Sequence, residues 1–474
     1  MIKFRKKQSV IDMIYDYINL NRESKTPLYK QLYASIRKAI ESNGLTKGDR
    51  LVSIRKLSKA LNISKTTVEA AYSQLCAEGY IKNHPQRGYF IEGRVLKIEE
   101  KPGNIGADGR SLPTTPIRYD LGSKSVAVDS TGIRLWKKYV RSYLNKDYVI
   151  ASYGDPQGEP QLRRALSFYS YSVRGVIATD ENIVIAAGTQ SVLYIICGLL
   201  RSFGIRIAVE SEASPHIIRV FIDCGFTVIK TPSDNGGLRL DKLKESNPDF
   251  VLINPSGSLK SGDKMQMERR YELIRWAESE GKYIIEDDFN GEIVYRSRPI
   301  PALQCNSPSN VVYLGSFSKL LLPSVRIGYA VLPENMCLLY SHCRQTLNQT
   351  ASKLEQLALA DYIKDGHLER HLRRLKKIYA KKSEVLKESI IKNFKLIEPE
   401  AGIKLFETSL AYSVTINREI DSCDFLSKLQ QSGIEIISCE AYEGQTSIRL
   451  GFSGIDIEKI EPAVELLCSI IDKL

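Results

Sequence analysis

The chain has 474 residues, of which 43% are hydrophobic, and a net charge of +12. This length predicts two to four domains with a large core. No apolar run approaches the roughly 20 residues of a membrane helix, and the basic N-terminus lacks the apolar centre of a signal peptide. The nine cysteines are scattered, odd in number and without a Cys-x-x-Cys pair, which argues against a disulfide framework and a structural zinc site. We therefore expect a cytoplasmic protein with neither a membrane partner nor a metal.

Positive charge is concentrated at the N-terminal end. Residues 1–95 hold 18 Lys and Arg against 8 Asp and Glu, a net charge of +10, so the total of +12 leaves only +2 for the rest. A basic segment joined to a nearly neutral body predicts a polyanion-binding module attached to a second domain.

Helical periodicity dominates the first eighty residues. Apolar spacing predicts helices over residues 9–20 and from Leu28 to about Asn43. Two short helices follow, Ser53–Leu61 and one that begins at Ser64, and each starts with a serine suited to an N-cap. The second of these would bury Val68, Ala71, Tyr72 and Leu75.

Two short strands come next, Tyr80–Lys82 and Tyr89–Ile91, joined by a turn. Two helices around a tight turn and a following hairpin describe a winged helix-turn-helix, which we assign to residues 1–95. A helical adaptor with a solvated basic face is the alternative. The side chains predicted to contact double-stranded DNA are Ser53, Arg55, Lys65, Thr66, Thr67 and Arg87.

The hydrophobic pattern changes after a Gly- and Pro-rich stretch. We interpret residues 96–118 as a linker. From residue 119 to 474 strands alternate with helices, which predicts an α/β domain built on a mainly parallel sheet with both faces covered.

Polar residues follow four predicted strands of this domain. The strands are 183–186, 250–253, 283–286 and 311–314, and the residues that follow them are Gly188-Thr189-Gln190, Asn254, Asp287 and the Ser316–Lys319 loop. Ligands of open α/β sheets bind outside the carboxyl ends of the strands, and the amides that open a helix after Gly188 suit a phosphate. The sequence thus predicts one ligand site at this edge.

Lys319 and Arg326 suggest which ligand this is, because an amine and a guanidinium suit an aldehyde and a phosphate on one molecule. The segment Ser316-x-x-Lys319…Arg326-x-Gly328 resembles that of fold-type I enzymes dependent on pyridoxal 5'-phosphate (PLP). A Ser/Lys-rich loop of another α/β protein is the alternative.

The resemblance implies that Lys319 forms a Schiff base with PLP and that Asp287 pairs with the pyridine nitrogen. It further implies contacts to the cofactor from Arg326, Ser316, Ser318, Gly188, Thr189, Gln190 and Asn254. We assign no role to the neighbouring Glu286 and Asp288, since a lone carboxylate there is more often structural.

Three further segments bear on the site. Arg449 lies in a short apolar strand and matches the arginine that binds an amino acid's α-carboxylate in aminotransferases, with an internal salt bridge as the alternative. Tyr153 opens a segment resembling the one that reaches a partner subunit's phosphate. The helix with His367 and His371 we interpret as a solvated basic helix rather than a metal site.

A GntR-type winged helix, a linker and an aminotransferase-like domain, in this order, resemble the MocR/GabR family of bacterial transcription regulators. The start of the GntR helix appears here as Val52-Ser53-Ile-Arg55-Lys-Leu57-Ser58, without the family's proline. The resemblance implies a head-to-tail homodimer that binds DNA and PLP and senses an amine, an amino acid or PLP itself. An active aminotransferase with an accessory N-terminal module, and a regulator whose pocket has lost PLP, are the competing hypotheses.

Several residues depart from the family pattern. Phe289 replaces the tyrosine that bonds the cofactor's phenolic oxygen, Ser214 replaces the ring-stacking tyrosine, and Lys404 replaces a histidine. A lost hydrogen bond to a charged group costs about 1.5–3 kcal/mol, and a lost aromatic stack about 0.5–1.5 kcal/mol. We therefore expect catalysis to suffer more than cofactor binding, and we assign no catalytic residue.

Overall fold

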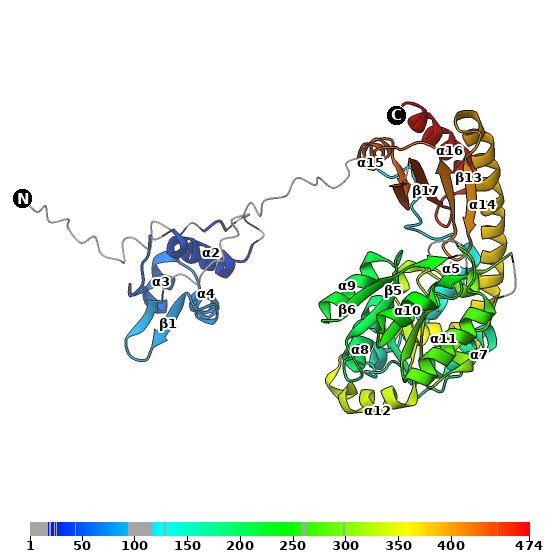
Figure 1. Ribbon diagram of the computed structural model, residues 1–474. Helices are drawn as coiled ribbons and strands as arrows, with labels where there is room; N and C mark the ends of the chain where they lie inside the picture. Colours follow the sequence, from blue (N-terminus) through cyan, green and yellow to red (C-terminus); the bar gives the residue numbers. More distant parts are fainter. Residues whose placement is uncertain are drawn as a thin grey trace, which may run out of the picture. The chain divides into compact units, whose positions relative to one another are not determined.

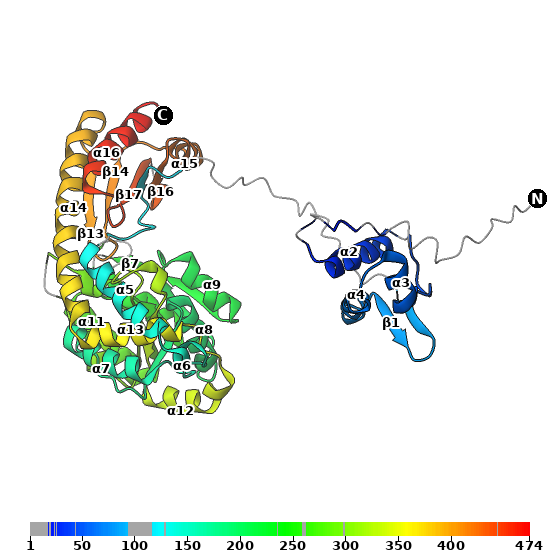
Figure 2. The ribbon, with the colours of Figure 1, turned by 180° about the vertical axis from the view of Figure 1, so that it is seen from behind.

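A computed structural model describes residues 18, 20–22, 24, 26–42, 44–92, 116–127, 129–234, 236–257, 262–296, 299–442 and 444–474. The chain divides into two compact units, Met1–Leu112 and Pro113–Leu474, each of which can be followed in Figures 1 and 2. Most of the helix expected over 9–20, and the expected linker up to residue 115, fall outside the described residues. Among the described residues, no helix has the length and apolarity needed to cross a membrane.

The first unit has the elements of a winged helix-turn-helix. They are α2 (Leu28–Glu41), α3 (Ile54–Leu61), α4 (Lys65–Ala77), β1 (Ile81–His84) and β2 (Gly88–Ile91). Strands β1 and β2 pair antiparallel. The four residues predicted to be buried on α4 are all fully buried, and Ser53 and Ser64 accept hydrogen bonds from Lys56 N and Thr67 N as N-caps. The sequence prediction of this fold is confirmed.

A seven-stranded sheet forms the centre of the second unit, in the order β4-β12-β11-β10-β9-β5-β6. Its strands are β4 (Ile183–Ala186), β5 (Arg206–Glu210), β6 (Thr227–Thr231), β9 (Phe250–Ile253), β10 (Tyr283–Asp287), β11 (Val311–Ser316) and β12 (Gly328–Val331). Strand β12 runs antiparallel to both neighbours, and the other pairs are parallel. The expectation of a mainly parallel sheet is confirmed.

Helices cover both faces of this sheet. They are α5 (Ser130–Leu144), α6 (Asp147–Ile150), α7 (Pro160–Arg174), α8 (Thr189–Leu200), α9 (Pro215–Asp223), α10 (Leu240–Ser246), α11 (Met267–Glu280), α12 (Glu334–Cys343) and α13 (Lys353–Lys364). Alternate residues of β4 belong to different apolar clusters, Ile183 and Ile185 to one and Val184 and Ala186 to another. This period of two is typical of a strand in a sheet that is covered on both faces.

A smaller antiparallel sheet, in the order β13-β14-β17-β16, lies beyond the large one. Its strands are β13 (Gly402–Phe406), β14 (Ala411–Ile416), β16 (Ser438–Tyr442) and β17 (Gln445–Gly451), and α14 (His367–Ile397), α15 (Ser422–Gln431) and α16 (Ile457–Asp472) accompany them. Strands β3 (Tyr119–Leu121) and β15 (Ile434–Ile436) pair in parallel. The short elements are β7 (Ser233–Asp234), β8 (Gly237–Leu238), η1 (Gly291–Ile293), η2 (Leu303–Asn306), η3 (Pro323–Val325) and η4 (Arg344–Thr346).

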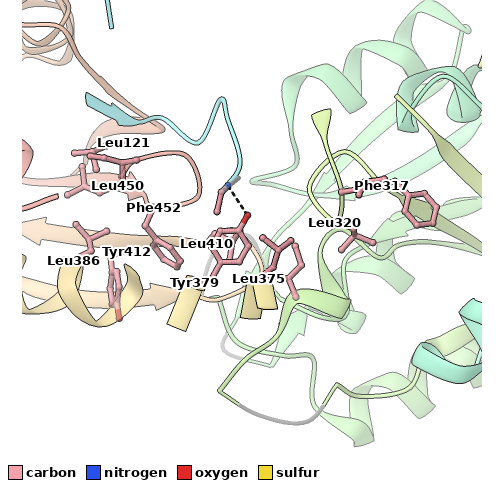
Figure 3. Packing of buried hydrophobic residues seen from close by; sticks show 14 of the residues in the cluster. Leu121, Phe317, Leu320, Leu375, Tyr379, Leu386, Leu410, Tyr412, Leu450 and Phe452 are labelled. Atoms are coloured by element: carbon pink, nitrogen blue, oxygen red, sulfur yellow. Dashed lines mark hydrogen bonds between the residues drawn. The ribbon is translucent and has the colours of Figure 1, made fainter. Parts of the chain in front are cut away.

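Helix α14 joins the two sheets through one continuous apolar cluster (Figure 3). Leu375 and Leu386 belong to this cluster together with Phe317 of the large-sheet side and Phe452 beyond β17. The Tyr379 hydroxyl, also on α14, accepts a hydrogen bond from Ala127 N at 3.4 Å. The segment that leads into α5 is therefore attached to the helix that joins both sheets.

Candidate functional site

The predicted strand ends converge because β9, β10 and β11 are adjacent parallel strands. Asp287 lies opposite Leu314 in the β10–β11 register, and Glu286 lies opposite Ile253 in the β10–β9 register. A cavity of about 280 Å³ opens at this edge. Its walls are Thr189, Glu210, Ala213, Ser214, Ile217, Leu252, Ile253, Asn254, Asp287 and Phe289.

Asp287 presents an unsatisfied carboxylate to this cavity. Burial, and to a lesser extent repulsion from Asp288, raise its pKa to about 7. Within the part of the chain that the structure describes, this carboxylate has no hydrogen-bond partner. A partly buried carboxylate without a partner is unfavourable, so a cation in the cavity would stabilise its ionised form.

The carboxylates on either side of Asp287 are, in contrast, satisfied by the protein. Asp288 accepts from Arg174 Nε at 2.6 Å and from the Tyr313 hydroxyl at 2.8 Å. Glu286 accepts from the backbone amides of Leu303 and Gln304 at 2.8 and 3.0 Å. Both are structural, as expected from the sequence.

Gly188, Arg326 and Gly328 form a tight cradle at the start of α8. Gly188 has a φ of 81° and opens the helix without a side-chain cap. A Cβ atom there would lie 3.1 Å from Arg326 Nη2, and one on Gly328 would lie 2.8 Å from the Gly188 carbonyl carbon. A guanidinium thus meets uncapped helical amides where only glycine fits, an arrangement that suits a phosphate.

Lys319 lies in the loop after β11, partly buried. Its amine donates a hydrogen bond to the Ser123 carbonyl and lies 3.5 Å from the Ser125 carbonyl. Burial lowers its pKa, which raises the share of neutral amine, the form that attacks a carbonyl. The hydroxyls of Ser316 and Ser318 lie 3.4 Å apart in the same loop.

Other predicted residues lie apart from the cavity walls. The Gln190 side chain donates to the His216 carbonyl at 3.2 Å, away from the cradle. Tyr153 is fully exposed. Arg449, on β17, is partly buried with its guanidinium 4.3 Å from the Phe406 ring centre, and burial lowers its pKa.

Two features could not be found from sequence spacing. His371, expected on a solvated helix, is buried, and its Nδ1 lies 3.2 Å from Asp129 Oδ2. The prediction of a solvated helix was therefore wrong for His371, because α5 packs over this residue. Glu210 lines the cavity with a hydrogen bond from Ser233, and burial raises its pKa to about 7. Each contact joins residues that only the tertiary fold brings together.

In the first unit, the residues predicted to bind DNA lie on the surface. Arg55, Lys65 and Arg87 are exposed, and Arg87 is at the turn between β1 and β2. Ser64 Oγ lies 2.8 and 2.7 Å from the hydroxyls of Thr66 and Thr67. The two threonines therefore lie in the first turn of α4, and their hydroxyls contact the N-cap serine.

Family models match both units. Residues 28–91 match "Bacterial regulatory proteins, gntR family", and residues 125–467 match "Aminotransferase class I and II". The HTH-type transcriptional regulator YdeL of Bacillus subtilis is 30% identical over 94% of this chain and 97% of its own length. The probable rhizopine catabolism regulatory protein MocR of Rhizobium meliloti is 28% identical over 77% of this chain and 78% of its own. The pyridoxine biosynthesis regulator PdxR of Corynebacterium glutamicum is 29% identical over 79% and 81%.

Solved structures resemble the second unit in fold. An archaeal alanine:glyoxylate aminotransferase superposes with a TM-score of 0.65 at 20% identity, over 74% of this chain and 90% of its own. The kynurenine aminotransferase of Pyrococcus horikoshii gives 0.64 at 23% identity, over 76% and 92%. The fold-type I aminotransferase architecture is thereby established for residues 113–474.

Proposed function

Because the chain belongs to the HTH-type transcription regulators of the MocR kind, which join a gntR-family domain to an aminotransferase class I and II domain, we propose that its second domain binds PLP and uses it to sense a small molecule. The sensed molecule is an amine, an amino acid or PLP itself. The first domain binds double-stranded DNA.

The Asp287 carboxylate is the observation that carries this proposal. It faces a cavity of about 280 Å³ with a pKa raised to about 7 and no hydrogen-bond partner in the described residues. The protonated pyridine nitrogen of PLP is a cation that could pair with this carboxylate. The cradle of Gly188 and Arg326 offers an anion site for the phosphate at the start of the adjacent helix.

The remaining contacts are those that the resemblance to fold-type I enzymes implies. Lys319 would supply the amine that holds the cofactor, and its lowered pKa favours the reactive neutral form. Asn254 and Thr189 line the cavity and orient the ring. Ser316 and Ser318 lie in the lysine's loop and would donate to the phosphate. When bound, PLP supplies an electron sink for groups bonded to its aldehyde carbon.

Phe289 and Ser214 favour sensing over turnover. Both line the cavity. Each stands where the family pattern has a tyrosine, and neither can make the contact that this tyrosine makes. Phe289 cannot donate a hydrogen bond, and Ser214 cannot stack on a ring. The pocket thus keeps the groups that hold PLP and lacks two that tune it, which suits a protein whose output is DNA binding.

Arg449 is the candidate for the effector's carboxylate, since a guanidinium binds a carboxylate through two parallel hydrogen bonds. We also propose a head-to-tail homodimer. The support is Tyr153, whose side chain is fully exposed in the single chain although its segment resembles one that reaches a partner's phosphate.

The test is a PLP titration followed by the visible absorbance that appears when PLP bonds a protein amine. We expect saturable binding by the full chain, loss of the absorbance band in Lys319→Ala, and no change in the matched control Lys428→Ala, whose lysine pairs with Asp424 on the surface of α15. Absence of the band in the wild-type protein, or its persistence in Lys319→Ala, would refute the cofactor proposal.

DNA binding by the first domain has its own test. Arg55→Ala and Lys65→Ala, both at exposed positions, should weaken DNA binding in a fluorescence anisotropy assay without changing the PLP titration. Rapid multiple turnover of an amino acid and a keto acid, with DNA binding insensitive to both substitutions, would instead support an aminotransferase with an accessory module.

A further inference from the structure

Helix α5 packs, inclined, against the beginning of α14 (Figure 2). Asp129, the N-cap of α5, accepts from Arg374 Nε at 2.7 Å and from His371 at 3.2 Å. Ten residues later, the ring of Tyr139 lies 5.6 Å from that of His367, at the beginning of α14. The contacts thus proceed forward along α5 and backward along α14.

These two helices hold much of the positive charge of residues 96–474. Helix α5 has four Lys and Arg and no Asp or Glu, and residues 367–383 of α14 have seven Lys and Arg against one Glu. Their combined net charge is +10, whereas residues 96–474 as a whole carry +2. The rest of residues 96–474 is therefore net negative, at −8, and the basic charge is gathered on one pair of helices.

Most of this charge is exposed to solvent without a counter-charge. Eight cations are exposed and occur three or four residues apart along their helices, or as direct neighbours: Arg134, Lys137, Lys138, Arg141, Arg370, Arg373, Lys377 and Lys381. None of the eight forms a salt bridge with a carboxylate of the described residues, while Arg374 turns toward Asp129 between the helices. Like charges at this spacing repel one another and destabilise a helix slightly, so an anionic partner would relieve this repulsion.

We propose that the two basic stripes made by those eight cations, one on α5 and one on α14 and together called the α5–α14 face, are a second contact surface for the phosphate backbone of double-stranded DNA. The cations extend about 10 Å along α5 and about 16 Å along α14, comparable with about three and about five base pairs of duplex. Its residues are long cations without interleaved aromatic side chains, which suits contacts to phosphates and not to bases.

DNA is the favoured polyanion because the gntR domain of the same chain binds DNA and holds it near the second domain. Once that domain has bound, flanking duplex is present at a high effective concentration for any basic surface on the attached body. The proposal does not depend on PLP, and it makes the aminotransferase-like domain a direct participant in the DNA complex.

Salt dependence of DNA binding tests the proposal, because each phosphate contact contributes about 0.9 to the slope of log affinity against log salt concentration. The probe is a mixed-sequence duplex of about 60 base pairs, long enough to extend beyond the gntR domain. For the full-length triple variant Arg373→Gln, Lys377→Gln, Lys381→Gln we expect a slope shallower by about 2 to 3 and affinity lower by about 10- to 100-fold at moderate salt.

The matched control removes three exposed cations elsewhere on the same domain, Lys244→Gln, Arg275→Gln and Lys473→Gln. This control should leave the slope within experimental error of the wild type. An unchanged slope in the α14 triple variant would overturn the proposal, and so would an equal loss in both variants, which would indicate only a general effect of net charge. Binding of the face to anionic vesicles in place of DNA would overturn it as well.

Discussion

Replacing Asp287 by Asn should stabilise the free protein at neutral and higher pH while weakening its affinity for PLP. The pKa of Asp287 is about 7 in the folded chain against an ordinary value of 3.8. A carboxyl whose folded pKa is raised contributes its full stability below the ordinary pKa and loses it as pH rises through about 7. The difference corresponds to at most about 4 kcal/mol. Because Asp287 retains some exposure at the cavity wall, we expect a gain of about 1–3 kcal/mol.

Urea unfolding followed by tryptophan fluorescence measures this effect in the correct domain. The chain has two tryptophans, Trp136 and Trp276, and both belong to the unit Pro113–Leu474. The advantage of Asp287→Asn over the wild type should grow between about pH 4 and about pH 7 and then level off. Saturating PLP should reverse the order at high pH, because the ionised carboxylate then pairs with the pyridine nitrogen.

Asp424→Asn is the matched control, since this exposed carboxylate pairs with Lys428 on the surface of α15. It should change stability by less than about 0.5 kcal/mol, without a pH-dependent gain centred near neutrality. The reasoning would be refuted if Asp287→Asn were less stable than the wild type above neutral pH without PLP, or if it bound PLP with unchanged affinity.

Four further substitutions test other parts of the structure. Phe289→Tyr restores a hydroxyl at the cavity wall and should raise PLP affinity by about 5- to 30-fold in the absorbance titration; no gain would mean that residue 289 does not reach the cofactor. Gly188→Ala places a Cβ 3.1 Å from Arg326 Nη2 at a φ of 81°, so PLP binding should weaken by at least about tenfold with circular dichroism unchanged; wild-type affinity would count against the phosphate cradle. Asp288→Ala leaves Arg174 buried without its partner and should cost about 3–5 kcal/mol in urea unfolding; a cost below about 1 kcal/mol would show that the ion pair is dispensable. Ser64→Ala removes the N-cap of α4 and should cost about 1 kcal/mol, seen as a lower melting temperature of the DNA-binding domain, whereas an unchanged melting temperature would contradict the capping role.

Local patterns were sufficient to predict the elements of both domains. The serine caps of α3 and α4 and the apolar face of α4 are short-range features, and they lie where periodicity and capping rules place them. Strands β4 and β9 have the predicted bounds, because runs of buried β-branched and aromatic residues bounded by turns are typical of strands covered on both faces. The shared edge of Asn254, Asp287 and the Lys319 loop followed from the rule that parallel strands present their carboxyl ends together.

Tertiary structure decided what each polar side chain meets. Asp287 and Asp288 are adjacent in sequence, yet one faces the cavity and the other is bonded by Arg174, 114 residues away. Successive side chains of an extended segment point to opposite sides, so the sequence alone predicted the type of site but not which carboxylate would lack a partner. The same holds for His371, which belongs to a basic helix in the sequence and is buried only because Asp129 and α5 pack over it. Sequence pattern thus determined the folds and the ligand-binding edge, and long-range packing determined the protonation, burial and partners of the groups placed there.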